Sequence, residues 1–154
     1  MATTGPDLEQ VYDSIFGQFS TVWATGTPAV NGGAIPPIEY PDEPQTETPL
    51  SKSTVPWARI AAKHATRQTT TIGYTIPGQG RVEADGIVMV NIFVPAGKRG
   101  LALAARLGKV AITAFEGQRT GDVWFTDVVP EEVGVDGAWF QYNVKAKFHY
   151  NNHL

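Results

Sequence analysis

The chain has 154 residues, with 12 Lys and Arg, 15 Asp and Glu, and no Cys. A length near 150 predicts a single domain that buries about 70% of its unfolded surface, so it needs no disulfide or metal for stability. The absence of Cys excludes a disulfide scaffold, thiolate metal sites and a Cys nucleophile. The N-terminus lacks the basic and apolar regions of a signal peptide, and no apolar run reaches the ~20 residues of a membrane span. We therefore expect a soluble intracellular protein. The net charge of −3 argues against a chain that as a whole clamps nucleic acid.

Charged side chains are scarce and unevenly distributed. They make up 18% of the residues, below the roughly 25% of ordinary soluble proteins, which favours a protein that buries surface against partners. Residues 1–50 carry seven acidic side chains and no Lys or Arg, whereas residues 51–109 carry nine basic and two acidic ones. Either these segments neutralise each other within one fold, or an acidic face of one copy meets a basic face of the next.

Residues 7–24 are predicted to form an amphipathic helix. Its apolar side chains recur at spacings of three and four, which places them on one stripe: Leu8, Val11, Tyr12, Ile15, Phe19, Val22 and Trp23. Asp7 suits the N-cap, and Gly26 is placed to end the helix. We expect this stripe to pack in the core rather than to bind a cofactor.

Residues 26–56 form a Pro-rich arm that contains seven of the eleven prolines. Because Pro fixes φ and removes a backbone donor, only a short piece around Ile38-Glu39-Tyr40 can pair, and it would do so as an edge strand. A structureless stretch of this length is uncommon inside a compact domain, so we expect an ordered arm that lies over a surface.

Two extended segments follow the arm. In the first, residues 57–71, the side chains of Ala58, Ile60 and Ala62 alternate with a basic set on the other side, namely Arg59, Lys63 and Arg67. A turn-rich tip at residues 77–80 then leads through residues 81–86 into the almost continuously apolar run 87–94. Such a run predicts a strand that is covered on both faces.

The C-terminal half is predicted to contain one helix and two strands. The helix spans residues 100–116, with Gly117 as its C-cap, and buries Leu103, Leu107, Val110, Ala111, Ala114 and Phe115. A turn at residues 135–138 separates the strands, and the last strand alternates inward Phe140, Tyr142, Val144, Ala146, Phe148 and Tyr150 with polar residues. The chain therefore predicts a single α+β domain: a small antiparallel or mixed sheet, two helices on one face and a Pro-rich arm.

The side chains that could carry chemistry do not converge in the sequence. His64, His149 and His153 lack the spacing of metal ligands, and His149 and His153 are expected to have ordinary surface roles. The carboxylates at 42–43 and 131–132 are adjacent in sequence and expected to be solvated. No nucleophile elbow, phosphate-binding loop or dinucleotide fingerprint is present. We therefore expect no enzyme, no cofactor and no metal site.

One turn, residues 95–100, follows a strand and opens a helix. Its Lys98 and Arg99 could contact an anion at the helix N-terminus. Since the rest of a P-loop is missing, a plain strand–helix turn is the better reading.

The order of these features resembles the tail-terminator (tail-completion) proteins of long, non-contractile-tailed bacteriophages of the lambda type. The resemblance covers about residues 7–150 and rests on the N-terminal helix, Ile38-Glu39-Tyr40-Pro41, Pro56-Trp57-Ala58-Arg59-Ile60, the run from Arg81 to Gly97, the Leu- and Ala-rich helix, and Trp139-Phe140-Gln141-Tyr142-Asn143-Val144. The chain departs from the family at Asp42, where relatives often carry Asn, and in the more basic turn at 97–100.

The resemblance implies a structural virion protein without catalytic activity. Such proteins form a ring, a hexamer by this resemblance, that caps the tail tube at its head-proximal end, stops tail polymerisation and offers a docking surface to the head-completion or neck protein. The implied partners are further copies of the chain, the major tail tube protein, the neck protein and the genomic DNA, which passes through the lumen without sequence-specific binding. We expect a lumen without a dense Lys and Arg lining, against the alternative that Arg81, Lys98 and Arg99 face the DNA.

The arm 26–56 and the hairpin 67–83 are the expected contact elements, because both are turn-rich and too long for simple connections. The candidate residues for contacts between subunits or with the tube are Tyr40, Asp42, Glu43, Trp57, Arg59, Arg67, Tyr74 and Arg81. Two alternatives stay open: a head-closure or neck adaptor protein, and an anion-binding or hydrolytic domain that uses the turn at 95–100.

Overall fold

The computed structural model of the chain describes residues 8–41, 55–69, 81–97 and 100–153. Its elements follow in the order α1 (Leu8–Gly26), β1 (Ile38–Glu39), β2 (Trp57–Thr69), β3 (Arg81–Pro95), α2 (Gly100–Phe115), β4 (Arg119–Thr120), β5 (Val123–Asp136) and β6 (Trp139–His153). The predicted N-cap Asp7 and the predicted tip at 77–80 lie outside the described residues. Neither helix of the described chain is long and apolar enough to cross a membrane.

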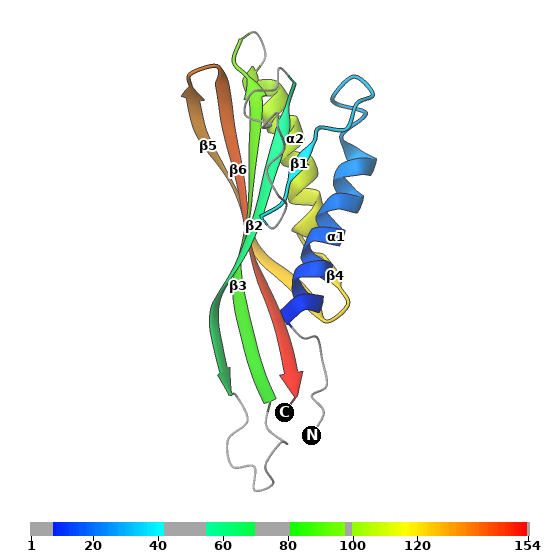
Figure 1. The fold of residues 1–154 in the computed structure, drawn as a ribbon, viewed down its shortest axis with the longest axis vertical. Coiled ribbons are helices and arrows are strands. Elements are labelled where there is room, and N and C mark those ends of the chain that lie inside the picture. Colours follow the sequence, from blue (N-terminus) through cyan, green and yellow to red (C-terminus); the bar gives the residue numbers. More distant parts are fainter. Residues whose placement is uncertain (1–7, 42–54, 70–80, 98–99, 154) are drawn as a thin grey trace, which may run out of the picture.

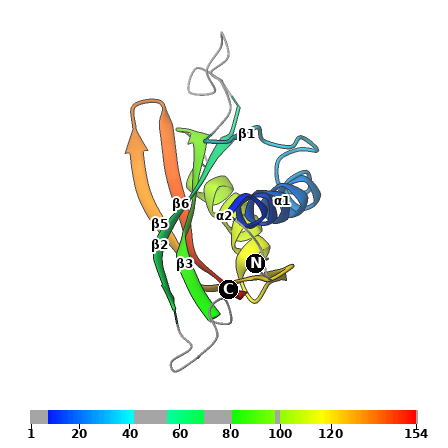
Figure 2. The same ribbon diagram turned by 60° about the horizontal axis from the view of Figure 1, so that its bottom comes forward.

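The six strands form one mixed sheet in the order β1-β2-β3-β6-β5-β4. Every neighbouring pair is antiparallel except β1 and β2, which are parallel. The sheet twists strongly and curls into a half-barrel, and both helices lie on the same side of it (Figures 1 and 2). The predicted α+β class is confirmed, with the sheet mixed and both helices on one face.

Both helices bury the stripes that their sequences predict. In α1 the buried side chains are Val11, Ile15, Phe19 and Trp23, and in α2 they include Ala104, Leu107, Ala111, Ala114 and Phe115. The helix α2 rests on the central strands, where Gly108 leaves room for the ring of Tyr142. Helix α1 packs beside α2 and ends at Gly26, as predicted, and Gly117 follows α2 with a positive φ of 67°.

The short strand β1 confirms the predicted edge strand at Ile38. It is held from two sides, because the Trp23 indole Nε1 donates to the Pro36 carbonyl at 2.9 Å and the Ala58 amide donates to the Pro37 carbonyl at 2.9 Å. The end of α1 therefore fixes the loop that delivers β1 to the sheet. The part of the arm from 42 to 54 lies outside the described residues.

Strands β3 and β6 supply the centre of the core. On β6 the predicted alternation is confirmed, with Val144, Ala146, Phe148 and Tyr150 buried toward the helices. The prediction that β3 is covered on both faces is wrong: Val88, Val90 and Ile92 are buried, whereas Ile87 is 45% exposed. The reason is that the two helices pack on the same side, so the other side of the central strand has no covering element in the described chain.

A β-bulge in β2 corrects a second prediction. The register shifts between His64 and Thr66, so that Arg67 pairs with Ala84, which is buried toward the helices. Cross-strand partners share a face of the sheet, so Arg67 lies on the helix side and not with Arg59 and Lys63 as predicted.

Candidate functional site

The side of the sheet that faces away from the helices is the first candidate surface, and we call it the open face. Its central rows run across β2, β3, β6 and β5, and their members are Arg59, Asn91, Asn143 and Glu131; Ala61, Met89, Lys145 and Val129; and Lys63, Ile87, Lys147 and Thr126. No helix or strand of the described chain covers these rows (Figure 2). Strands of 13 to 15 residues make this an extended surface rather than a cleft.

Most bases of the open face have an acidic partner. Lys145 Nζ lies 3.1 Å from Glu131 Oε2, and Lys147 Nζ lies 3.2 Å from Asp127 Oδ2. Asp127 lies in the β-bulge between Thr126 and Val129 and has a φ of 51°, a left-handed conformation that Asp tolerates better than most residues. These pairs are exposed, so each contributes little stability, but together they keep the middle of the open face close to neutral.

An aromatic cluster occupies the end of the open face nearest β1. The Trp57 ring stacks on Phe93 with 4.2 Å between centroids and meets Trp139 edge-on at 6.2 Å. Arg59 lies over the Trp57 ring at 5.3 Å, and its Nε is 3.3 Å from Glu39 Oε1. A shallow hollow of about 170 Å³ is lined by Trp57, Arg59, Phe93, Asp136, Trp139 and Gln141.

Trp57 is only 2% exposed, and its indole N–H has no hydrogen-bond partner among the described residues. Of the candidate pair Trp57 and Arg59, therefore, only Arg59 presents an exposed side chain. The buried Trp57 ring packs under the Arg59 guanidinium and supports its position.

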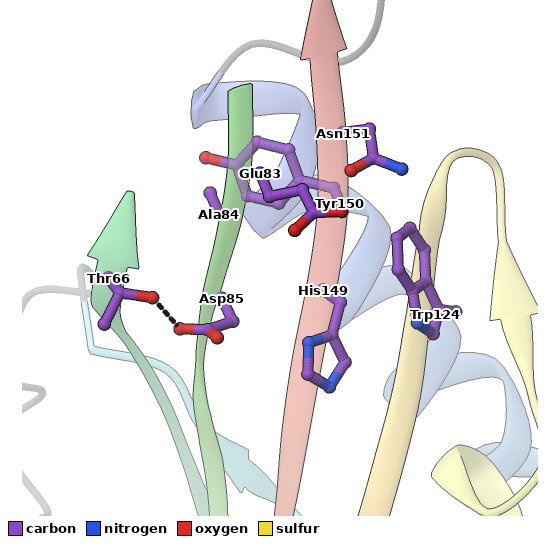
Figure 3. Close-up of a pocket in the computed structure, with 8 residues that line it drawn as sticks. All are labelled: Thr66, Glu83, Ala84, Asp85, Trp124, His149, Tyr150 and Asn151. Carbon is purple, nitrogen blue, oxygen red and sulfur yellow. Dashed lines mark hydrogen bonds between the residues drawn. The ribbon is translucent and has the colours of Figure 1, made fainter. Parts of the chain in front are cut away.

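A polar hollow of about 110 Å³ lies toward the other end of the open face (Figure 3). It is lined by Thr66, Glu83, Ala84, Asp85, Trp124, His149, Tyr150 and Asn151. Thr66 donates to the Asp85 carboxylate, and the His149 ring stacks on Trp124 at 5.6 Å. Figure 3 shows the Asp85 and His149 side chains on neighbouring strands. The described residues contain no group of three His, Cys, Asp or Glu that could hold a metal ion, so we assign no metal to this hollow.

His64 occupies a distinct position on the helix side of β2. Its Nδ1 lies 2.8 Å from the Tyr12 hydroxyl and its Nε2 lies 2.8 Å from the Tyr150 hydroxyl, so the imidazole joins α1, β2 and β6. Burial and, secondarily, the Arg67 guanidinium lower the pKa of His64. Burial also raises the pKa of Tyr150, so both groups favour their neutral forms.

Both edges of the sheet are open over much of their length, and they differ in charge. We define the β2 edge as residues 60–69, beyond the two residues that pair with β1, and the β5 edge as residues 126–136, beyond the two that pair with β4. The β2 edge carries Lys63 and Arg67 and no acid, whereas the β5 edge carries Asp127, Glu131, Glu132 and Asp136 and no base. Within the described chain, Lys63, Arg67, Glu132 and Asp136 form no ion pair.

The candidate residues from the sequence fall at opposite ends of the sheet. Tyr40 follows β1, is half-buried and packs edge-on against Phe16 of α1 at 5.7 Å, on the helix side of the sheet, whereas Trp57 and Arg59 lie on the open face. Arg67 is exposed near the end of β2, and Arg81 begins β3 opposite His153. Asp42, Glu43, Tyr74, Lys98 and Arg99 lie outside the described residues.

Sequence reasoning missed His64 and the acidic β5 edge. The signal for His64 was its place in the alternation Ala58, Ile60, Ala62, His64, which puts it on the apolar side of β2. The signal for the β5 edge was a strand-length segment with four acids and no base, but its pairing partner could not be read from the sequence.

The comparisons with known proteins concern the fold alone. No known protein family and no curated protein matches the chain. A solved structure of a protein whose name states no function aligns over 90% of this chain and 94% of its own length, with a TM-score of 0.56 and 17% sequence identity. At that identity the likeness shows a shared fold.

Proposed function

We propose that this protein is a tail terminator of a long-tailed bacteriophage, a structural ring that caps the tail tube and stops its polymerisation. The observation that carries the proposal is that, among the described residues, both helices pack on one side of the sheet and leave a long sheet face and two oppositely charged sheet edges uncovered. Exposed strand edges present unpaired backbone groups that can pair with another chain. The sequence resemblance supplies the specific assembly.

A ring suits these surfaces because its contacts are heterologous: one surface of each subunit meets a different surface of the next. The β2 and β5 edges are two different surfaces of this kind. The partners in the proposal are further copies of the chain, the major tail tube protein and the head-completion or neck protein. Genomic DNA passes through the lumen, and the protein resides at the head-proximal end of the tail in the virion.

The proposal is tested by assembling phage without this protein and measuring tail lengths by negative-stain electron microscopy. A tail terminator predicts tails that are longer than normal and variable in length, with complementation by the wild-type chain restoring a single length. Tails of normal length beside heads that leak DNA would contradict termination and favour the head-closure or neck adaptor alternative.

A further inference from the structure

We propose that the β5 edge of one copy pairs with the β2 edge of the next copy in an antiparallel register that places Asp136 opposite Lys63 and Glu132 opposite Arg67. This inference rests on the proposed ring and names the surfaces that build it. It makes the sheet continuous from one subunit to its neighbour.

The β2 edge is available for pairing over most of its length. The amide of Ala58 points outward, because it donates to Pro37 of β1 at 2.9 Å. Backbone groups alternate along a strand, so those of Ile60 and Ala62 also point outward, but β1 pairs with β2 only at Ala58 and Arg59. In the described chain no strand takes up these groups, and the β5 edge is equally free beyond Phe125, whose amide donates to the Gln118 carbonyl at 3.3 Å.

The irregularities of the two strands match in this register. The β2 strand has its bulge between His64 and Thr66, and β5 has one between Glu132 and Gly134. With Lys63 opposite Asp136, the bulges meet, and the strands return to step together at Arg67 and Glu132. A bulge interrupts a ladder in any regular partner strand, so two bulges in matching positions preserve pairing on both sides of them.

The same register places the charges on matching faces of the sheet. Lys63 pairs with Ile87 and Asp136 with Trp139, so both lie on the open face. Arg67 and Glu132 both lie on the helix side, because their partners are Ala84 and Tyr142, which pack in the core. Opposite charges directly across two strands stabilise their pairing, whereas like charges there destabilise it.

The length of the free edge also fits. Continuing from Asp136, the hairpin turn at Gly137 and Ala138 of the neighbour reaches Ala62 and Ala61, and β1 begins to cover β2 just beyond, at Arg59. The incoming hairpin therefore ends where β1 takes over the edge. No described residue of β1 needs to move.

Apolar contacts add to the charges. Along the β2 edge, the small side chains of Ala61, Ala62 and Ala65 form, with Lys63, His64, Ile87 and Met89, a shallow recess of about 550 Å³. The β5 edge exposes three valines, at 53% for Val129, 52% for Val133 and 67% for Val135. In the proposed register Val135 comes opposite His64, which lines the recess, and Val133 comes opposite Thr66, next to Ala65.

The pairing is heterologous, so each copy binds one neighbour through its β2 edge and another through its β5 edge. Copies therefore add until the last one pairs with the first and the ring closes. The two free edges are staggered along the strand direction, since the β2 edge extends beyond β1 while the β5 edge extends toward the hairpin turn (Figure 1). A sheet that closes on itself requires such a stagger, because its strands must tilt relative to the ring axis.

The test uses two charge-reversal variants of the full chain, Lys63→Glu/Arg67→Glu and Glu132→Lys/Asp136→Lys. Each alone places like charges across the interface, and we expect each to associate about tenfold or more weakly than the wild type. Mixed in equal amounts, they restore opposite charges at every interface of an alternating ring, so the mixture is expected to assemble like the wild type. The measurement is native mass spectrometry with light scattering.

A matched control reverses exposed charges on the helices, with Glu9→Lys and Lys109→Glu, and is expected to assemble normally. Circular dichroism establishes that every variant folds. Either variant assembling alone as well as the wild type, or a folded mixture that fails to assemble, would overturn the pairing. Rings that form through other surfaces would contradict the edge pairing but not the tail-terminator proposal. Rings that depend on these edges, together with tails of normal length when the protein is absent, would contradict only the tail-terminator proposal.

Discussion

His64 lies where three elements meet, and its protonation state decides how it bonds there. A neutral imidazole has one donor and one acceptor nitrogen, so it accepts a hydrogen bond from one tyrosine hydroxyl and donates to the other. Tyr12 and Tyr150 provide these partners at 2.8 Å each. Because Tyr150 is only 2% exposed, its hydroxyl depends on this protein partner. The imidazole therefore ties helix α1 to the sheet in its neutral form.

This arrangement predicts a loss of stability in mild acid. Burial, and then Arg67, lower the pKa of His64 in the folded chain below the ordinary value of 6.5, so the unfolded chain binds the proton more readily. The stabilisation by neutral His64 is complete above that value and is lost as the pH falls from about 6.5 through the lower folded pKa. Urea unfolding between pH 7.5 and 5 measures it.

The control is His64→Gln, which retains a donor and an acceptor but does not titrate. We expect the variant to be less stable at pH 7.5 because its side chain is smaller, yet its free energy of unfolding should fall less steeply between pH 7 and 5. An equally steep fall in the variant would show that other groups cause the acid sensitivity.

At the scale of elements, the β2 bulge and Gly86 belong together. Gly86 lies opposite His64 at the bulge, and a Cβ there would meet both the Lys63 carbonyl oxygen and the Phe148 ring. The Phe148 ring thus fills the place of a missing side chain, and the bulged strand approaches β3 closely at the same point. Neither neighbour can move easily: the Lys63 carbonyl belongs to the backbone of the paired strand β2, and the Phe148 ring is packed in the core.

Gly86→Ala is therefore expected to destabilise the fold by about 1–3 kcal/mol, the usual cost of an added group in a close-packed core. The matched control is Gly17→Ala on α1, where nothing lies within 4 Å of the added Cβ. That change should stabilise the protein by up to about 1 kcal/mol, since Ala favours a helix more than Gly does. Chemical denaturation of both variants measures the difference, and equal effects would contradict the close approach at Gly86.

The sequence predicts most elements here because their signals are local. The helix stripes, the glycines at 26 and 117, the alternation of β6 and the short Pro-free piece around Ile38 depend on neighbours a few residues away. The side of Arg67 could not be predicted, because a bulge depends on the partner strand. The uncovered side of β3 could not be predicted either. An apolar run does not show whether helices cover one face of its strand or both.

For the whole molecule, the segregation of charge along the sequence is partly resolved by the fold. The Arg59–Glu39 pair joins the basic middle segment to the acidic first segment, as internal neutralisation requires. Lys145 and Lys147 find their partners on β5 instead, within the C-terminal third. Among the described residues, Lys63, Arg67, Glu132 and Asp136 at the two sheet edges stay without an ion pair, as do several charges on the helices. The uneven charge distribution in the sequence is therefore explained in part by ion pairs within the domain. The remaining charges at the sheet edges are available to a neighbouring copy.

The ion pairs of the open face bear on how a ring would treat the DNA that passes through it. Non-specific DNA binding grows with the number of cations free to contact phosphates. In the described chain the central rows of the open face hold four bases, Arg59, Lys63, Lys145 and Lys147, and only Lys63 among them lacks an acidic partner. In the proposed ring, a surface neutralised in this way would let DNA slide past, whichever part of it faced the lumen.

Asp127→Asn combined with Glu131→Gln should free Lys147 and Lys145 without altering side-chain size. We expect the variant to bind duplex DNA about tenfold more tightly than the wild type at low salt, with a steeper loss of affinity as salt rises, because two further cations per copy reach phosphates. Fluorescence anisotropy with a labelled duplex at several salt concentrations measures both quantities. Lys145→Gln with Lys147→Gln serves as the control and should not increase binding. Strong, salt-sensitive binding by the wild-type chain would contradict the idea that these pairs keep the surface from gripping DNA.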